Sequence, residues 1–134
     1  MAVLLYATWM EHWINSLIVI ACMRKRVPSE QVTELLRETS FRGKTTWLIS
    51  ILDKPAIAPS HRNRMLQVLD LRNAFVHYKW RGLSEEALEQ QEKAIAISLE
   101  RLPATVKYLN QYERKHLYHG SKRKVRAAVR LGAA

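Results

Sequence analysis

An apolar run at the N-terminus places the strongest constraint on the fold of this chain. Residues 1–23 are apolar with few exceptions, namely Thr8, Glu11, His12, Asn15 and Ser16. At about 100° per residue, all of these except Ser16 fall within one stripe of a helix. A helix that is apolar nearly all round is usually buried, and a short polar window on it must face a partner or a wet cleft. We therefore expect a buried first helix whose polar window has a function.

A membrane span is the alternative for this run, and we do not favour it. Glu11 at mid-span would cost about 2.5–3.5 kcal/mol on insertion scales, and other polar residues of the window add to that. The basic residues 24–26 follow the apolar run, whereas a signal peptide carries its positive charges before it. We expect no contact with a membrane.

The helix start and stop signals in the rest of the chain predict an all-α fold in one domain. A chain of 134 residues with only 4 Gly and 4 Pro has too few turn-formers for a many-stranded sandwich or barrel. We expect helices from Ser29 to about Glu38, from a cap at Ser60 to about Trp80, and from Ser84 to about His119. The predicted interruptions between and within these helices are Gly43, the loop 54–59, Gly82 and a kink or new start at Pro103. The result is a bundle of about five helices.

Charge is concentrated at the C-terminus. The chain holds 22 Lys and Arg against 12 Asp and Glu, a balance that favours polyanionic partners. Residues 114–134 contain no acid, so we divide the chain into a helical domain over 1–113 and a basic extension over 114–134 that includes the end of the last helix. The extension is either a solvated tail or an RNA-binding element. Its candidate RNA-binding residues are Lys122, Arg123, Lys124 and Arg126.

The single cysteine carries little chemistry. Cys22 lies in the apolar run, where we interpret it as a core residue. One cysteine excludes an internal disulfide and a multi-cysteine zinc site, which favours a reducing compartment such as the cytoplasm. We expect no metal and no cofactor.

Arg72 is the most informative charged residue. On a helical wheel it lies in the middle of an apolar stripe that includes Met65, Val68 and Leu69. Arginine is almost never buried without a partner. Glu11 in the polar window is the candidate for an ion pair, and a groove that receives a phosphate is the functional alternative; both can hold together.

His77 lies about 140° from Arg72 on an ideal helix, so the two side chains do not point together. A histidine among polar neighbours is commonly a surface residue. A curled Arg72 side chain or a twofold dimer would bring them together, and Asn73, one turn before His77, is placed to support its ring.

These residues resemble a known family. An Arg followed by a polar Asn, three further residues and a His, near the end of a long helix in a small all-α protein, resembles the R-x(4–6)-H signature of HEPN (higher eukaryotes and prokaryotes nucleotide-binding) domains. The flanking aromatics Tyr78 and Trp80 and the run 11–15 in an apolar first helix agree with it. The resemblance covers roughly residues 1–110.

The resemblance implies a metal-independent endoribonuclease that acts as a homodimer, frequently as a toxin or anti-phage effector. It makes Arg72 and His77 catalytic and Asn73 a residue that shapes the site; we add Glu11 as a further site-shaping residue because it lies in the window expected to face Arg72. Histidine suits a general base at the ribose 2′-hydroxyl, and arginine suits stabilisation of the phosphorane.

One position departs from the family pattern. In the branch neutralised by a nucleotidyltransferase partner, a Tyr stands two residues after the His, and here Lys79 occupies that position. Neutralisation by that route is therefore in doubt, although a cognate antitoxin protein remains a possible partner, and we interpret Tyr78 as a packing residue. The alternative function is a non-catalytic helical dimer that binds RNA, a nucleotide or a protein partner.

Overall fold

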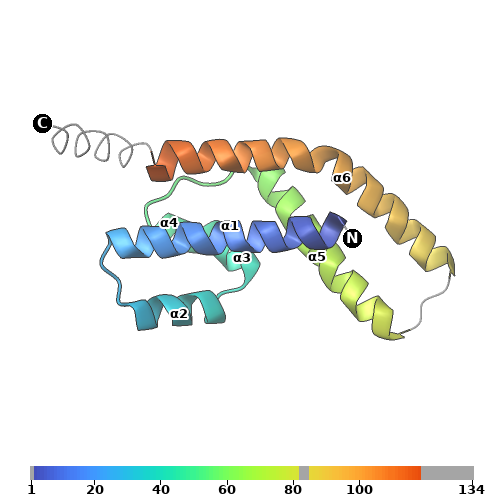
Figure 1. Ribbon diagram of the computed structural model, residues 1–134, viewed down its shortest axis with the longest axis horizontal. Helices are drawn as coiled ribbons and strands as arrows, with labels where there is room; N and C mark the ends of the chain where they lie inside the picture. The colour runs from blue at the N-terminus through green and yellow to red at the C-terminus, as the bar shows by residue number, and fades with distance from the viewer. Residues whose placement is uncertain (1, 82–84, 119–134) are drawn as a thin grey trace, which may run out of the picture.

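The computed structural model describes residues 2–81 and 85–118, and every regular element within these ranges is helical (Figure 1). The long helices are α1 (Ala2–Arg24), α5 (Pro59–Arg81) and α6 (Glu85–Glu113). The shorter α2 (Ser29–Glu38) follows α1 and has the bounds expected from the sequence. The expected all-α helical bundle is confirmed.

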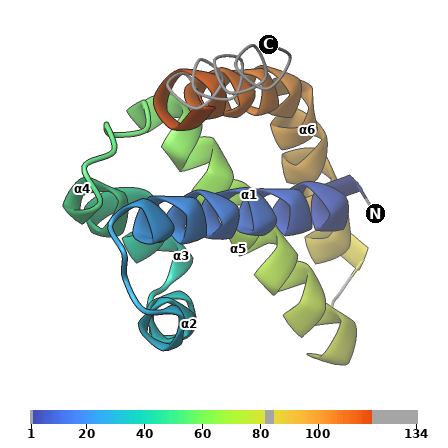
Figure 2. The same ribbon diagram turned by 60° about the vertical axis from the view of Figure 1, so that its left-hand side comes forward.

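Helix α1 is the central element of the bundle. It packs against α5 and α6 and also contacts α2; Figures 1 and 2 show it crossing α5 while the C-terminal half of α6 runs beside it. Buried side chains recur along its whole length: Val3, Ala7, Met10, Trp13, Ile14, Leu17, Ile18, Ala21 and Cys22. The expectation of a buried first helix is confirmed, and so is the place of Cys22 in the core, where burial raises the pKa of its thiol.

The same helix is long and apolar enough over Val3–Arg24 to cross a membrane, judged by length and composition alone. In the folded chain its apolar side chains pack against α5 and α6 to form the hydrophobic core.

Gly43 does not break the helix, contrary to the prediction. Residues 41–51 form one helical run made of α3 (Phe41–Gly43), the π-helical segment η1 (Lys44–Leu48) and α4 (Ile49–Ile51). Gly43 has ordinary helical dihedral angles, φ −63° and ψ −41°. A Cβ atom there would lie 2.8 Å from Nε1 of Trp47 and 3.0 Å from Cγ2 of Thr39. The glycine therefore permits a close approach of the Trp47 indole instead of reversing the chain.

The loop before α5 is one residue shorter than expected. Pro59 begins the helix. Proline suits this position because an N–H in the first helical turn has no partner within the helix, so its absence costs nothing, and because the φ of proline is already helical. The N–H of Arg62 donates to the carbonyl of Ala58 at 2.9 Å, so Ser60 lies inside the first turn and is not the N-cap residue. The expected end near Trp80 agrees with the observed end at Arg81.

Helix α6 contains Pro103 and is bent (Figure 1), as expected for an internal proline. The π-helical segment η2 (Arg114–Tyr118) continues it. Leu117 is buried in the core, and its carbonyl accepts a hydrogen bond from the Arg24 guanidinium. The folded unit therefore extends beyond the boundary placed at residue 113, because η2 supplies part of the core. The predictions for Gly82, Ser84 and the tail after Tyr118 fall outside the described residues.

Candidate functional site

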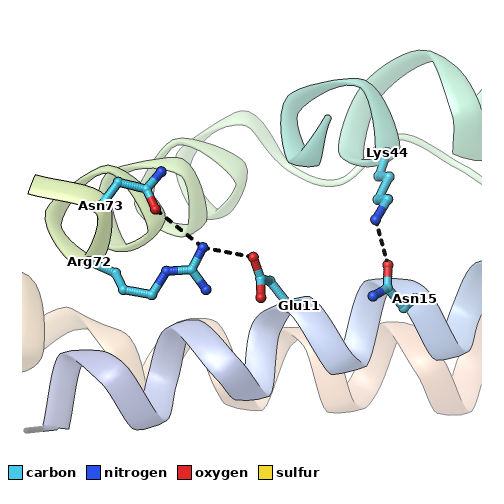
Figure 3. A network of polar contacts seen from close by, with 5 residues as sticks. All are labelled: Glu11, Asn15, Lys44, Arg72 and Asn73. Atoms are coloured by element: carbon cyan, nitrogen blue, oxygen red, sulfur yellow. Dashed lines mark hydrogen bonds and ion pairs between the residues drawn. The ribbon is translucent and has the colours of Figure 1, made fainter. Parts of the chain in front are cut away.

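The polar window of α1 faces cationic side chains from two other elements (Figure 3). Glu11 accepts a hydrogen bond from Arg72 of α5. Asn15, one helical turn further along, accepts a hydrogen bond from Lys44 of η1. Thr8 is exposed at the N-terminal end of the same window. The window thus forms a polar strip on an otherwise apolar helix, as the sequence predicts.

Arg72 reaches Glu11 from the middle of the core-facing stripe of α5. Its Nη2 donates to Oε1 of Glu11 at 2.8 Å and to Oδ1 of Asn73 at 3.3 Å. The side chain of Arg72 is 23% exposed and that of Glu11 is 41% exposed. The predicted ion pair is confirmed. Both contacts use Nη2, and within the described residues the other guanidinium nitrogens make no hydrogen bond to a side chain.

The apolar neighbours of Arg72 explain why its side chain lies against α1. Met65, Val68 and Leu69 on the preceding turns of α5 are all buried. A guanidinium at this position cannot turn far into solvent without exposing its aliphatic stem, so it lies against α1 and takes its charge partner there.

Lys44 is the site residue that sequence reasoning missed. Its Nζ donates to Oδ1 of Asn15 at 2.8 Å, and the contact is partly buried. Burial lowers the pKa of the Lys44 ammonium, while the nearby carboxylate of Glu11 acts in the opposite direction. The one signal in the sequence is that Asn15 shares a stripe with Glu11, which indicates a second polar contact of this stripe beside the ion pair of Glu11.

The structure places His77 on α5, five positions after Arg72, and its side chain lies outside the described residues. Asn73 is exposed and accepts a hydrogen bond from Arg72, so Arg72, Asn73 and Glu11 form one connected group. His12, beside Glu11 on α1, is exposed. The side chain of Tyr78, with the predicted packing role, also lies outside the described residues, as do Lys122, Arg123, Lys124 and Arg126.

A second cluster, the aromatic cluster of His61, Tyr108, Tyr112 and His116, contacts α1 through the edge-on pair of Tyr112 with Trp13. His61 stacks on Tyr108 with ring centroids 4.2 Å apart, and Tyr112 meets the edge of His116 at 4.8 Å. The hydroxyl of Tyr112 donates to the carbonyl of Pro55 at 2.5 Å, and the hydroxyl of Tyr108 accepts from the N–H of Ala58 at 2.8 Å. These hydrogen bonds anchor the loop before α5 to α6, which gives the cluster a structural role.

A metal centre is not found in the part of the chain that the structure describes: no group of three or more His, Cys, Asp or Glu side chains there is arranged to hold an ion.

Comparison of the chain with protein-family models, with curated proteins and with solved structures found no match.

Proposed function

We propose that this chain is a metal-independent endoribonuclease of the HEPN type. The environment of Arg72 carries the proposal. Its guanidinium lies 2.8 Å from the carboxylate of Glu11, and the side chain of Arg72 remains 23% exposed. An arginine that is fixed in direction and open to solvent suits a phosphate, because its remaining N–H groups match two phosphate oxygens. An Arg72 fully sequestered by Glu11 would instead have favoured a helical dimer that binds without cleaving.

In the proposed reaction, the 2′-oxygen of a ribose attacks the adjacent phosphorus. His77 accepts the proton of the 2′-hydroxyl, the bond from phosphorus to the 5′-oxygen breaks, and the leaving oxygen takes up a proton. The products are a 2′,3′-cyclic phosphate and a 5′-hydroxyl. Arg72 stabilises the negative charge of the phosphorane, while Glu11 and Asn73 fix the direction of the guanidinium.

The proposed active form is a homodimer in which two α5 helices meet. On one ideal helix, Arg72 and His77 point about 140° apart, so a twofold axis would set Arg72 beside the partner subunit's His77. Val76, between them on α5, is an exposed large apolar residue at 49% exposure, which supports an interface on this face. A strict monomer by light scattering at micromolar concentration would contradict the dimer.

Such an enzyme would act in the cytoplasm of a prokaryote as a toxin or anti-phage effector. Lys79 replaces the tyrosine that one branch of the family modifies, so a cognate antitoxin protein would neutralise this chain by another route.

Cleavage of single-stranded RNA by matched variants tests the proposal. His77→Ala and Arg72→Ala should each abolish cleavage, with a loss of about 10²–10⁴ from removal of the general base alone. Arg101→Ala, which removes an exposed arginine of α6 away from the polar window, is the control and should retain activity.

Two further conditions probe the chemistry. Cleavage should persist in EDTA and should stop when the ribose at the cleaved position lacks its 2′-hydroxyl. Cleavage that survives loss of the 2′-hydroxyl, or that stops in EDTA, would refute the scheme. RNA binding without any cleavage would favour the non-catalytic alternative.

A further inference from the structure

We infer that Lys44 and Asn15 form a second phosphate-binding position beside that of Arg72, so that the polar strip of α1 holds two neighbouring phosphates of one RNA strand. The inference rests on the proposed function, because the ligand is the RNA backbone on which Arg72 acts. Lys44 has no part in that proposal or in the family signature.

The spacing along α1 supports this arrangement. Glu11 and Asn15 are four residues apart, which is about 6 Å along a helix and places them on one face. Figure 3 shows Arg72 and Lys44 approaching this face from the same side, one from α5 and one from the η1 run. Two cations whose partners on α1 stand one helical turn apart suit two successive phosphates of an extended strand.

The charge balance also favours an anion. Arg72 and Lys44 carry two positive charges against the one negative charge of Glu11. The Lys44 ammonium has three donors, of which Asn15 takes one, and the Asn15 amide nitrogen offers a further donor. A bound phosphate oxygen would accept hydrogen bonds from Lys44 in place of the water contacts that partial burial removes.

The backbone that carries Lys44 is itself unusual. Lys44 is the first residue of the π-helical segment η1, and π-helical turns frequently occur at functional sites. A Cβ atom on the preceding Gly43 would lie 2.8 Å from Nε1 of Trp47, so the indole packs closely on the backbone just before Lys44. From this turn the Lys44 side chain reaches α1, where its Nζ donates to Asn15.

A purely structural role is the alternative for Lys44, since it also satisfies Asn15. The two roles differ in their response to salt. A cation that neutralises a phosphate of a single strand contributes about 0.7 to the slope of log K against log[salt], and a merely structural lysine contributes nothing.

The experiment measures binding of a fluorescent single-stranded 2′-O-methyl oligoribonucleotide, which cannot react through its 2′-oxygen, between about 50 and 200 mM salt. Lys44→Gln should weaken binding several-fold and reduce the slope by about 0.7–1. Lys44→Arg should retain the slope. Lys107→Gln removes an exposed lysine of α6 and should leave both quantities unchanged.

Asn15→Asp separates binding from folding. An aspartate keeps an acceptor for Lys44, so the free energy of unfolding should hold, while its negative charge opposes a phosphate and should weaken binding more than Lys44→Gln does. In cleavage assays, Lys44→Gln should raise KM and leave kcat within about two-fold, because Lys44 binds beside the reacting phosphate.

The outcomes distinguish a failure of this inference from a failure of the proposed function on which it rests. A wild-type chain that does not bind the oligonucleotide would refute the proposed function and the second position together. Binding with an unchanged salt slope in Lys44→Gln, or unchanged affinity in Asn15→Asp, would refute the second position alone.

Discussion

The guanidinium of Arg72 and the carboxylate of Glu11 meet at 2.8 Å although 61 positions separate them in the chain. The contact joins α5 to α1, two helices that pack against each other and cross (Figure 2). The pair therefore links these two helices at the candidate site.

This ion pair predicts a measurable coupling. In a double-mutant cycle with Glu11→Gln and Arg72→Gln, we expect a coupling energy of about 0.5–1 kcal/mol, because a pair with exposed side chains is screened by water. Urea denaturation of the four proteins measures it. Free energies of unfolding that add within about 0.3 kcal/mol would mean that the pair contributes nothing to stability.

The ion pair was predictable because two isolated charges on apolar surfaces need each other. Arg72 stands mid-stripe among Met65, Val68 and Leu69, and Glu11 is the acid of the first helix. Both facts are local patterns of helical periodicity, which sequence records directly.

Lys44 could not be found in the same way. Gly43 was interpreted as a break, which separated Lys44 from any helix and from any face. The reason for this glycine is tertiary, since it gives space to Trp47, and propensity alone does not distinguish such a glycine from a helix stop. The start at Pro59 shows a similar ambiguity, because proline both ends loops and opens helices.

Gly43→Ala should destabilise the chain by about 1 kcal/mol in spite of the better helix propensity of alanine, because the new methyl group would meet Trp47. The control is the same substitution in a Trp47→Ala background. There the cost should shrink, since only the contact with Thr39 remains. Equal costs in both backgrounds, measured by thermal unfolding, would show that Trp47 does not dictate the glycine.

Tyr112 should make the chain sensitive to alkali. Burial, with a smaller effect of Tyr108, raises the pKa of the Tyr112 hydroxyl above its ordinary value of about 10. The neutral form is therefore favoured in the folded state, so its stabilisation is complete below pH 10 and is lost as pH rises above that, by up to about 1.4 kcal/mol per pH unit.

Tyr112→Phe should remove this alkaline loss. At neutral pH the variant should lose about 1 kcal/mol with the hydrogen bond to Pro55. Denaturation between about pH 8 and pH 11 gives the comparison. A variant whose stability falls with pH as steeply as that of the wild type would contradict the assignment.

His61 should make the chain sensitive to acid. Burial, followed by the charge of Arg64, lowers the pKa of the His61 ring below its ordinary value of about 6.5. The neutral ring is favoured in the folded state, so its stabilisation is present above pH 6.5 and is lost as pH falls through the lowered pKa.

His61→Phe keeps a ring to stack on Tyr108 and removes the titrating group, so stability should fall less between about pH 6.5 and pH 4.5. The contact of Nδ1 with the buried hydroxyl of Thr105 is lost as well, at a cost of about 1 kcal/mol at neutral pH. His12→Phe on the exposed part of α1 is the control. A free energy of unfolding that falls with decreasing pH as steeply in His61→Phe as in the wild type would contradict the prediction.

The C-terminal cations should add affinity for RNA without adding catalysis, and the structure defines where to remove them. A chain ending at Tyr112 would lose Leu117 from the core and the carbonyl that Arg24 contacts, so it would confuse binding with folding. A chain ending at Tyr118 keeps both. It lacks the cations Lys122, Arg123, Lys124, Arg126 and Arg130.

For the chain that ends at Tyr118, we expect an unchanged free energy of unfolding and weaker RNA binding. The slope of log K against log[salt] should shrink by at most about 3.5, or about 0.7 for each of five cations on a single strand. Turnover at saturating RNA should remain, because counterion release makes no bond to the reacting phosphate. Loss of turnover at saturation, with the fold intact, would place tail residues in the chemistry itself. An unchanged slope would show that the extension does not contact RNA.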